Sequence, residues 1–266
     1  MEEENRISFH NDTTEYSLSE IEEINFTNDG IGFIGYVMKP VDYDPNKKYP
    51  GVLHVHGGPK TVFGKVFHHE MQFLANNGYF VFFTNPRGSD GRGKEFADIR
   101  GKYGEIDFDD LMKFTDAVIK NYPALDEEKL AIMGGSYGGF MTISLITNYP
   151  DIYKVAVAGG PVIDWKWYEV MYGERYMGTP QANPEGYKSA NLNLKAGNLQ
   201  GHLMLIHCDT DPVVVWQHSL SFLKSYIKAG TYPDYFVYPG HAHNVIGPER
   251  VHLYEKVIRY FDDYLK

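Results

Sequence analysis

The sequence predicts an α/β fold: a mostly parallel, twisted sheet with helices on both faces and an antiparallel edge at its N-terminal end. After Pro50, continuous apolar or β-prone runs alternate with amphipathic helical patterns, which is typical of a parallel sheet that is buried on both faces. Before Pro50, two extended runs flank a turn sequence, which is typical of a hairpin. No repeat or low-complexity linker interrupts the chain, so we expect one domain over residues 1–266.

The predicted strands begin with the hairpin. Ile21–Thr27 and Phe33–Met38 flank Asn28-Asp29-Gly30, a turn sequence that favours an antiparallel pair. Each later strand is predicted from an apolar or β-prone run, and these runs are Gly51–Val55, Tyr79–Thr84, Leu130–Met133, Val155–Ala158, Leu203–Ile206 and Tyr235–Tyr238.

The helices are predicted between these strands, from apolar residues that recur at helical spacing. In residues 107–121 one face carries Phe108, Leu111, Met112, Thr115, Val118 and Ile119. Apolar residues also run from Phe140 to Ile146, and a helix is expected over Val213–Ile227. A C-terminal helix carries Leu253, Tyr254, Val257, Ile258, Phe261 and Leu265 on one face.

The composition excludes several classes of protein. Apolar residues make up 43% and charged residues 23%, as in ordinary soluble domains, and no apolar run is long enough to span a membrane. The net charge of −10 disfavours a nucleic-acid partner, which requires a basic face. Residues 1–6 lack the features of a signal peptide, and Cys208 is the only cysteine, so no intrachain disulfide can form. We expect a cytoplasmic protein without nucleic-acid or membrane partners.

One serine is a candidate nucleophile. Gly134-Gly135-Ser136-Tyr137-Gly138 follows a predicted strand, precedes a predicted helix and matches the G-x-S-x-G nucleophile elbow. The outer glycines allow neighbouring backbone to approach without a Cβ clash. A glycine-rich loop at the end of a strand is the alternative, but the flanking elements favour the elbow. The sequence therefore predicts an α/β-hydrolase fold with Ser136 as the nucleophile.

A serine needs a base to accept its proton, and in this fold the acid and then the histidine follow the serine along the chain. Asp209 and Asp211 follow the strand at Leu203–Ile206. His241 and His243 follow the next strand. The residues alone leave both choices open, and a loop or helix-capping carboxylate is the alternative for either aspartate.

The two histidines at positions i and i+2 also suggest a metal site. No third ligand lies at a spacing typical of zinc, however. We therefore predict that the protein binds neither a metal nor a cofactor.

The groups that would stabilise an oxyanion are predicted from two places. One donor is the amide of Tyr137, the residue after the serine. The other belongs to His56-Gly57-Gly58-Pro59, which follows the strand at Gly51–Val55. An ordinary glycine turn is the alternative for this loop.

These motifs, together with Asn85-Pro86-Arg87-Gly88-Ser89, resemble the catalytic domain of the prolyl oligopeptidase family of serine peptidases. The resemblance covers nearly the whole chain from about Ile21. Residues up to about Ile146 are most similar to the acylaminoacyl-peptidase-like branch. From Val157 onward the chain is similar to bacterial dipeptidyl-peptidase IV, in runs such as Tyr172–Met177 and Asp211–His218.

The resemblance implies a catalytic triad and an activity. It implies that Asp211 and His243, rather than their neighbours, act with Ser136. It also implies a serine peptidase that cleaves short peptides through an acyl-enzyme, after proline or a small residue, as dipeptidyl-peptidases and acylaminoacyl-peptidases do. An esterase with the same triad and a non-catalytic binding domain that keeps the fold are the alternatives. A homo-oligomer is left open.

The resemblance further implies a pocket for the proline ring, which a flat aromatic box would hold by shape. Its lining would be Tyr137, Val162, Trp165, Tyr168, Tyr172 and Val214. The spacing of Trp165, Tyr168 and Tyr172 suits one face of a core helix equally well, and that is the alternative.

This sequence departs from the family pattern in three ways. His56 stands where dipeptidyl-peptidase IV has a tyrosine, so the backbone N–H of Gly57 or Gly58 is expected as the second oxyanion donor. Val213 replaces an asparagine beside the substrate carbonyl. The β-propeller of the family has no counterpart in this sequence, so we do not expect the grip on a free amino terminus that it supplies.

Overall fold

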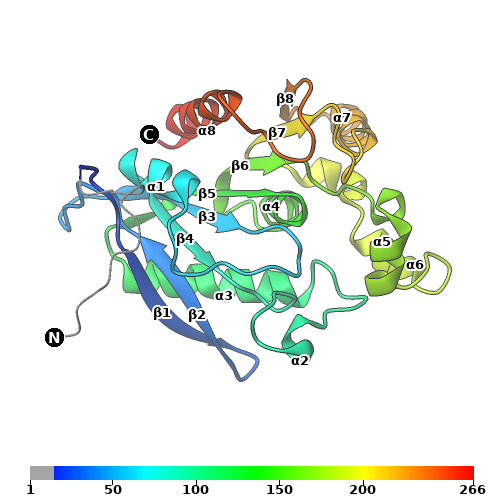
Figure 1. Cartoon of the computed structure of the whole chain (residues 1–266), viewed down its shortest axis with the longest axis horizontal. Coiled ribbons are helices and arrows are strands. Elements are labelled where there is room, and N and C mark those ends of the chain that lie inside the picture. The colour runs from blue at the N-terminus through cyan, green and yellow to red at the C-terminus, as the bar shows by residue number, and fades with distance from the viewer. Residues whose placement is uncertain (1–14) are drawn as a thin grey trace, which may run out of the picture.

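The computed structural model describes residues 15–266, in which one eight-stranded sheet is covered by helices on both faces (Figure 1). Residues 1–14, on which the expectation of no signal peptide rests, lie outside the described residues. The strand order is β1-β2-β4-β3-β5-β6-β7-β8. The strands are β1 (Ile21–Asn28), β2 (Ile31–Met38), β3 (Tyr49–Val55), β4 (Phe80–Thr84), β5 (Leu125–Gly135), β6 (Tyr153–Gly159), β7 (His202–Cys208) and β8 (Asp234–Tyr238).

The helices alternate with the parallel strands as the sequence predicts. They are α1 (His69–Asn76), α2 (Lys94–Ala97), α3 (Ile106–Asn121), α4 (Tyr137–Asn148), α5 (Val170–Met177), α6 (Pro184–Ser189), α7 (Gln217–Ala229) and α8 (Glu249–Leu265), with short 3₁₀ helices η1 (Trp165–Trp167) and η2 (Leu192–Asn198). No helix in the described part of the chain combines the length and the apolar character needed to cross a lipid bilayer.

The N-terminal hairpin forms the predicted antiparallel edge. β1 pairs with β2, and β2 pairs with β4, both antiparallel, whereas all other neighbours in the sheet are parallel. Asp29 and Gly30 in the hairpin turn both have positive φ, as a tight turn that matches the strand twist requires. The predicted fold class is therefore confirmed.

One predicted helix starts later than expected. The helix expected over Val213–Ile227 begins only at Gln217. Asp211 Oδ1 accepts the N–H groups of Val213 and Val214, at 2.8 and 3.0 Å, and this holds the chain in a turn ahead of the helix. The carboxylate thus closes a turn and is not the N-cap of α7.

The two faces of the sheet carry separate hydrophobic clusters. α3 and α4 cover one face, where Phe114 and Phe140 are buried. α1 and α8 cover the other face, where Leu74 and Phe261 are buried. Figure 1 shows α8 and α1 on one side of the sheet and α3 on the other. The central strands are covered on both sides, which explains their continuous apolar sequences.

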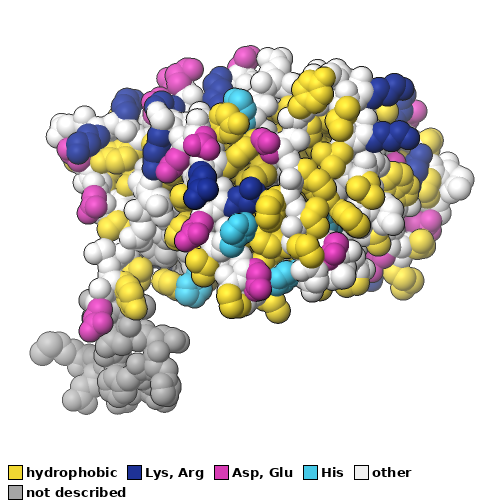
Figure 2. Space-filling model, turned by 90° about the horizontal axis from the view of Figure 1, so that it is seen from above, with side chains coloured by type: hydrophobic (Ala, Val, Ile, Leu, Met, Phe, Trp, Pro, Cys, Tyr) yellow, Lys and Arg dark blue, Asp and Glu magenta, His cyan; other side chains and the backbone are white. Residues whose placement is uncertain are grey.

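The surface seen from above is divided by chemistry (Figure 2). Charged side chains of both signs lie toward the left, where α8 and α1 lie in Figure 1, and a group of Lys and Arg side chains lies at the upper right edge. Hydrophobic side chains gather across the middle and right, over the loops near β8 and the region of α7 and α5. Such a gathering of apolar side chains is typical of a surface that binds another molecule.

A buried ion pair ties the hairpin to the rest of the fold. The Asp110 carboxylate on α3 is fully buried and lies 2.8 Å from the Arg87 guanidinium. It also accepts the backbone N–H of Arg87 and the side-chain amide of Asn28, both at 2.8 Å. Arg87 also pairs with the more exposed Asp29, at 2.9 Å. One carboxylate therefore joins α3, the loop after β4 and the hairpin.

We expect Asp110→Ala to lower the free energy of unfolding by about 3 kcal/mol, because it leaves the Arg87 charge without its buried partner. Urea denaturation measures this loss. Asp116→Ala, at an exposed position of the same helix, is the matched control and should change stability by less than about 0.5 kcal/mol. Equal effects of the two changes would show that the Arg87–Asp110 pair does not hold the hairpin.

Candidate active site

Ser136 stands at the tip of β5, in the turn that leads into α4. Its φ of 59° is positive, which is a strained conformation for a residue with a side chain. Added Cβ atoms on Gly134 and Gly138 would come within 2.5 and 2.3 Å of the Val55 carbonyl oxygen. Only glycine fits at positions 134 and 138. These two glycines allow β3 to pack closely against the turn after β5, and Ser136 lies in this turn at the end of the sheet.

The structure pairs Asp211 with His243. Asp211 follows β7, and His243 lies in the loop after β8. His243 Nδ1 lies 2.7 Å from Asp211 Oδ2, and the Asp211 side chain is 1% exposed. An ionised carboxylate can only accept, so Nδ1 carries the proton and the other ring nitrogen, Nε2, is free to accept one.

Asp211 is held ionised by its hydrogen bonds. Burial raises the pKa of Asp211, but hydrogen bonds from His207, His243 and the N–H groups of Val214 and Val213 outweigh burial. The pKa therefore lies well below the usual range of a carboxylic acid. A carboxylate in this state orients His243 and would stabilise its protonated form.

The neighbouring candidates make other contacts. The Asp209 carboxylate accepts the backbone N–H of Gly240, at 2.7 Å. His241 Nδ1 accepts the N–H of Ile246, at 3.4 Å. Both side chains hold the loop after β8 in place, and neither belongs to the aspartate–histidine pair.

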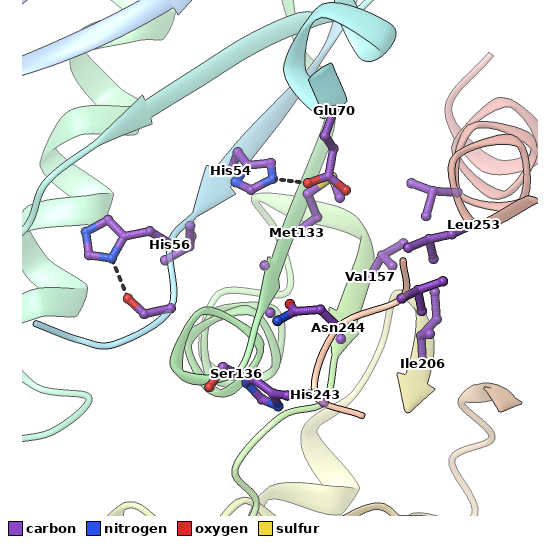
Figure 3. A pocket seen from close by; sticks show the side chains of 18 of the residues that line it. His54, His56, Glu70, Met133, Ser136, Val157, Ile206, His243, Asn244 and Leu253 are labelled. Carbon is purple, nitrogen blue, oxygen red and sulfur yellow. Dashed lines mark hydrogen bonds and ion pairs between the residues drawn. The ribbon is translucent and has the colours of Figure 1, made fainter. Parts of the chain in front are cut away.

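Ser136 and His243 line the same end of one cavity (Figure 3). Within residues 15–266, no hydrogen bond joins the Ser136 hydroxyl to His243. Catalytic hydrogen bonds are often long without substrate and tighten in the complex. The arrangement provides a nucleophile, a base and an acid that orients the base, in the chain order serine, aspartate, histidine.

A second histidine contacts the same carboxylate, and the sequence did not point to it. His207 Nε2 lies 2.8 Å from the Val214 carbonyl oxygen and 3.4 Å from Asp211 Oδ2. A carbonyl only accepts, so Nε2 carries the proton. His207 Nδ1 then accepts from the Ser219 hydroxyl, at 2.5 Å. His207 thus links β7, the Asp211 turn and α7 behind the aspartate–histidine pair.

The predicted oxyanion donors lie beside the serine. The N–H of Tyr137 is at the first position of α4, where helical amides have no partner within the helix. An added Cβ on Gly57 would lie 3.4 Å from Ser136 Cβ, so the backbone of this loop passes close to the serine. Gly58 has a φ of +119°, and an added Cβ would lie 2.5 Å from Lys60 N. The loop therefore needs glycine at this turn.

The His56 side chain turns away from the serine (Figure 3). Its Nδ1 donates to the Gly57 carbonyl, at 2.7 Å, and its Nε2 accepts from the Ser89 hydroxyl, at 2.9 Å. Burial lowers the pKa of His56 to about 4, so the ring is neutral at pH 7. With the imidazole engaged in this way, the N–H groups of Gly57 and Gly58 remain as the available donors of the loop.

The Asn85–Ser89 segment supports this loop. The Asn85 side chain bonds both backbone groups of Phe63, at 2.7 and 2.8 Å. Ser89 holds His56. The motif that follows β4 is therefore a scaffold for the loop that follows β3.

The alternative of one core helix face for Trp165, Tyr168 and Tyr172 is wrong, because the three residues lie in different elements. Trp165 lies in η1, Tyr168 is extended and Tyr172 lies in α5. The Asp164 side chain accepts the N–H of Lys166 and caps the start of η1, and the extended backbone at Tyr168 separates η1 from α5. The Tyr168 ring still contacts both of the others: its centroid lies 5.4 Å from that of Trp165 and 5.7 Å from that of Tyr172.

The six predicted pocket residues separate into two groups. Tyr137, Val162, Trp165 and Val214 are buried in the core on the α4 face. The Tyr137 hydroxyl donates to the Asp107 carboxylate, whose pKa burial raises to about 6. Tyr168 and Tyr172 are half-buried, and the Tyr172 hydroxyl donates to the Gly58 carbonyl, at 3.2 Å. These last two rings remain accessible to a substrate.

A cavity of about 760 Å³, here called the α8 cavity, opens beside the candidate catalytic side chains (Figure 3). Ser136 and His243 lie at one end, and His54 and Glu70 lie at the other, with His54 Nε2 2.9 Å from Glu70 Oε2. Apolar side chains line much of the space between them, namely Met133, Val157, Ile206, Leu253 and Val257. The polar side chains of Asn244 and Arg250 also line the cavity. None of the six predicted pocket residues lines the α8 cavity.

Gly160 is a further residue that the sequence did not indicate. Its φ is +45°, and an added Cβ would lie 3.4 Å from Asp211 Oδ2 and 3.7 Å from His243 Cε1. The Gly159-Gly160 pair directly after a predicted strand is the signal that could have indicated it.

Across residues 15–266, no cluster of His, Cys, Asp or Glu is placed to hold a metal ion.

Comparison with known proteins gives one clear family match. The model of the prolyl oligopeptidase family matches residues 65–266. Human dipeptidyl peptidase 8 is 34% identical over 235 residues, which is 85% of this chain and 26% of the human protein.

Solved structures agree in fold. A Bacteroides ovatus protein assigned as a dipeptidyl aminopeptidase IV is 42% identical, with a TM-score of 0.90, and the match covers 95% of this chain and 37% of that one. Acylaminoacyl peptidase of Pyrococcus horikoshii is 26% identical, with a TM-score of 0.89, and the match covers 95% of this chain and 42% of that one. The chain thus spans less than half the length of each of these relatives.

Stability should fall at acidic pH because His56 is buried. Its pKa is about 4 in the folded state and about 6.5 when unfolded, so the unfolded state binds more protons between these values. The contribution is fully present above pH 6.5 and is lost as the pH falls toward 4. From pH 7 to pH 5 we expect the loss from His56 to be about 2 kcal/mol.

Urea denaturation at pH 7 and pH 5 measures this loss. In His56→Gln the fall in unfolding free energy should be smaller by that amount than in the unchanged protein. His69→Gln, at an exposed position, is the matched control. An unaltered pH dependence in His56→Gln would contradict the assignment of a buried neutral imidazole.

Proposed function

Because this chain belongs to the prolyl oligopeptidase family, we propose that it is a serine peptidase that cleaves short peptides through an acyl-enzyme on Ser136. The observation that carries the proposal is the His243–Asp211 pair, with Nδ1 2.7 Å from Oδ2, placed on the same cavity as a serine in a nucleophile elbow. Similarity to dipeptidyl peptidase 8 and to acylaminoacyl peptidase supports peptides as the substrates.

The proposed reaction uses the proton arrangement of the triad. His243 Nε2 accepts the hydroxyl proton of Ser136 as the oxygen attacks the peptide carbonyl. The amides of Tyr137 and of Gly57 or Gly58 would stabilise the oxyanion that forms. His243 then gives the proton to the leaving amine. Water hydrolyses the acyl-enzyme by the same steps, with His243 again acting as the base.

The proposed preference is for proline or another small residue before the cleaved bond. Tyr172 supports this preference. Its hydroxyl donates to the Gly58 carbonyl, so the ring lies beside the His56–Pro59 loop, here called the oxyanion loop. Tyr168 packs against it. These two half-buried rings would contact the acyl side of a bound peptide.

Two measurements test the proposal. A fluorophosphonate probe should label Ser136 covalently, and Gly-Pro p-nitroanilide should be hydrolysed. Hydrolysis of p-nitrophenyl esters without any hydrolysis of peptide anilides would make the protein an esterase. Absence of both labelling and hydrolysis in the folded protein would leave a binding domain and would sink the proposal.

We expect Ser136→Ala to lower kcat by 10⁴-fold or more, on the order measured for triad knockouts, because the change removes the nucleophile. Turnover of the anilide measures the loss. The melting temperature should not fall, because the change removes one oxygen atom and leaves the backbone glycines in place. Substantial hydrolysis by the folded variant would refute the role of Ser136.

His243→Ala should abolish turnover in the same way, because it removes the base. His241→Ala is the matched control two residues away, and we expect it to lower kcat/KM by less than about tenfold, since it loses only the contacts to the Ile246 N–H at 3.4 Å and to Glu249 at 4.0 Å. Steady-state kinetics on both variants measures the difference. If His241→Ala proved to be the inactive variant, the histidine assignment would be wrong by two residues.

A further inference from the structure

The α8 cavity lies on the opposite side of Ser136 from the aromatic rings. Met133, Val157 and Ile206 point to the face of the sheet that α1 and α8 cover. Tyr137 and Trp165 belong to the cluster on the other face, below α4. Ser136 stands at the end of the sheet, between the two. A peptide whose carbonyl is held at Ser136 extends away from the serine in both directions.

The position of His243 decides which part of the peptide enters the cavity. The leaving amine must take its proton from His243, so it lies on the His243 side of the carbonyl. His243 and the next residues of its loop, Asn244 and Val245, line the cavity, and α8 continues directly from this loop. The amine part of the substrate is therefore directed into the cavity.

The chemistry of the walls defines what fits. The walls of the cavity are largely apolar, with Asn244 and Arg250 as polar members of the lining, and its volume of about 760 Å³ is within the range of ~300–1,000 Å³ that is typical of ligand pockets. At the far end, the Glu70 carboxylate is already engaged by the His54 imidazole, at 2.9 Å. The apolar walls, rather than this pair, are therefore available to a substrate side chain.

We infer that the α8 cavity binds a bulky apolar residue on the leaving-group side of the cleaved bond. This inference rests on the proposed peptidase function and specifies its substrates: short peptides with a residue such as leucine or phenylalanine after the cleaved bond. Burial of such a side chain in the cavity would favour these substrates over those with glycine.

Acyl transfer tests the inference directly, because the entering amine occupies the site that the leaving amine has vacated. The acyl-enzyme formed from Gly-Pro p-nitroanilide is offered leucinamide, phenylalaninamide or glycinamide in competition with water. The amine nitrogen attacks the ester carbonyl, its proton passes to His243, and Ser136 regains a proton as the ester bond breaks. The ratio of tripeptide amide to free Gly-Pro measures the capture of each amine.

We expect leucinamide and phenylalaninamide to be captured about tenfold better than glycinamide or more, as burial of a large apolar side chain implies. Leu253→Trp, which fills the cavity from α8, should remove this preference. Val251→Trp, at an exposed position of the same helix outside the cavity, is the matched control and should keep it. Leu253→Ala, which enlarges the cavity, should raise the capture of tryptophanamide relative to leucinamide.

The outcomes separate the two proposals. If the anilide is hydrolysed but all three amides are captured alike, the inference is wrong and the peptidase function stands. A preference that survives Leu253→Trp and is not shifted by Leu253→Ala overturns the inference as well. If no acyl-enzyme forms and no fluorophosphonate label attaches, both proposals fail.

Discussion

The backbone conformation of Ser136 is the constraint on which the site depends. The Ser136 N–H donates to the Gly159 carbonyl, at 2.8 Å. Gly134 and Gly138, which have no side chain, pack directly against the Val55 carbonyl. A positive φ in a residue with a side chain costs on the order of 1–3 kcal/mol, and the buried parallel strands on both sides hold it. This conformation places the hydroxyl at the sheet end, the Tyr137 amide at the start of α4 and the oxyanion loop beside both.

The carboxylate of Asp211 has a similar role on the other side of the site. Oδ1 receives two backbone amides, and Oδ2 receives His243 and, at a longer distance, His207. A buried carboxylate with all its acceptor sites engaged has one orientation, and so does the imidazole bound to it. His207 is in turn fixed by the Val214 carbonyl and the Ser219 hydroxyl, so β7, the Asp211 turn and α7 together set the orientation of His243.

Much of the fold and the centre of the site could be predicted because their signals are local. Continuous apolar runs identified the buried strands, and the glycines around Ser136 identified the elbow. The spacing of Trp165, Tyr168 and Tyr172 also suited one helical face, but extended backbone at Tyr168 separates η1 from α5, and no local pattern shows where η1 ends. In the sequence, no motif distinguishes His207 from any other residue at the end of a predicted strand. The α8 cavity joins β3, α1 and α8, which are far apart in sequence, so no local pattern could reveal it. A single domain and a cytoplasmic location stay predictions.

Ser136 and His243 are held in the fold in very different ways. Ser136 sits at the middle of the sheet, whereas His243 belongs to a loop after the edge strand β8, tied back by the Asp209–Gly240 bond and by Thr210, whose hydroxyl donates to the His241 carbonyl at 2.6 Å. α8 follows this loop and walls the cavity as well. Segments at the edge of a sheet open locally more often than central strands do. Partial detachment of the His243 loop and α8 would therefore withdraw His243 from Ser136 and uncover the cavity together, while the elbow stays folded.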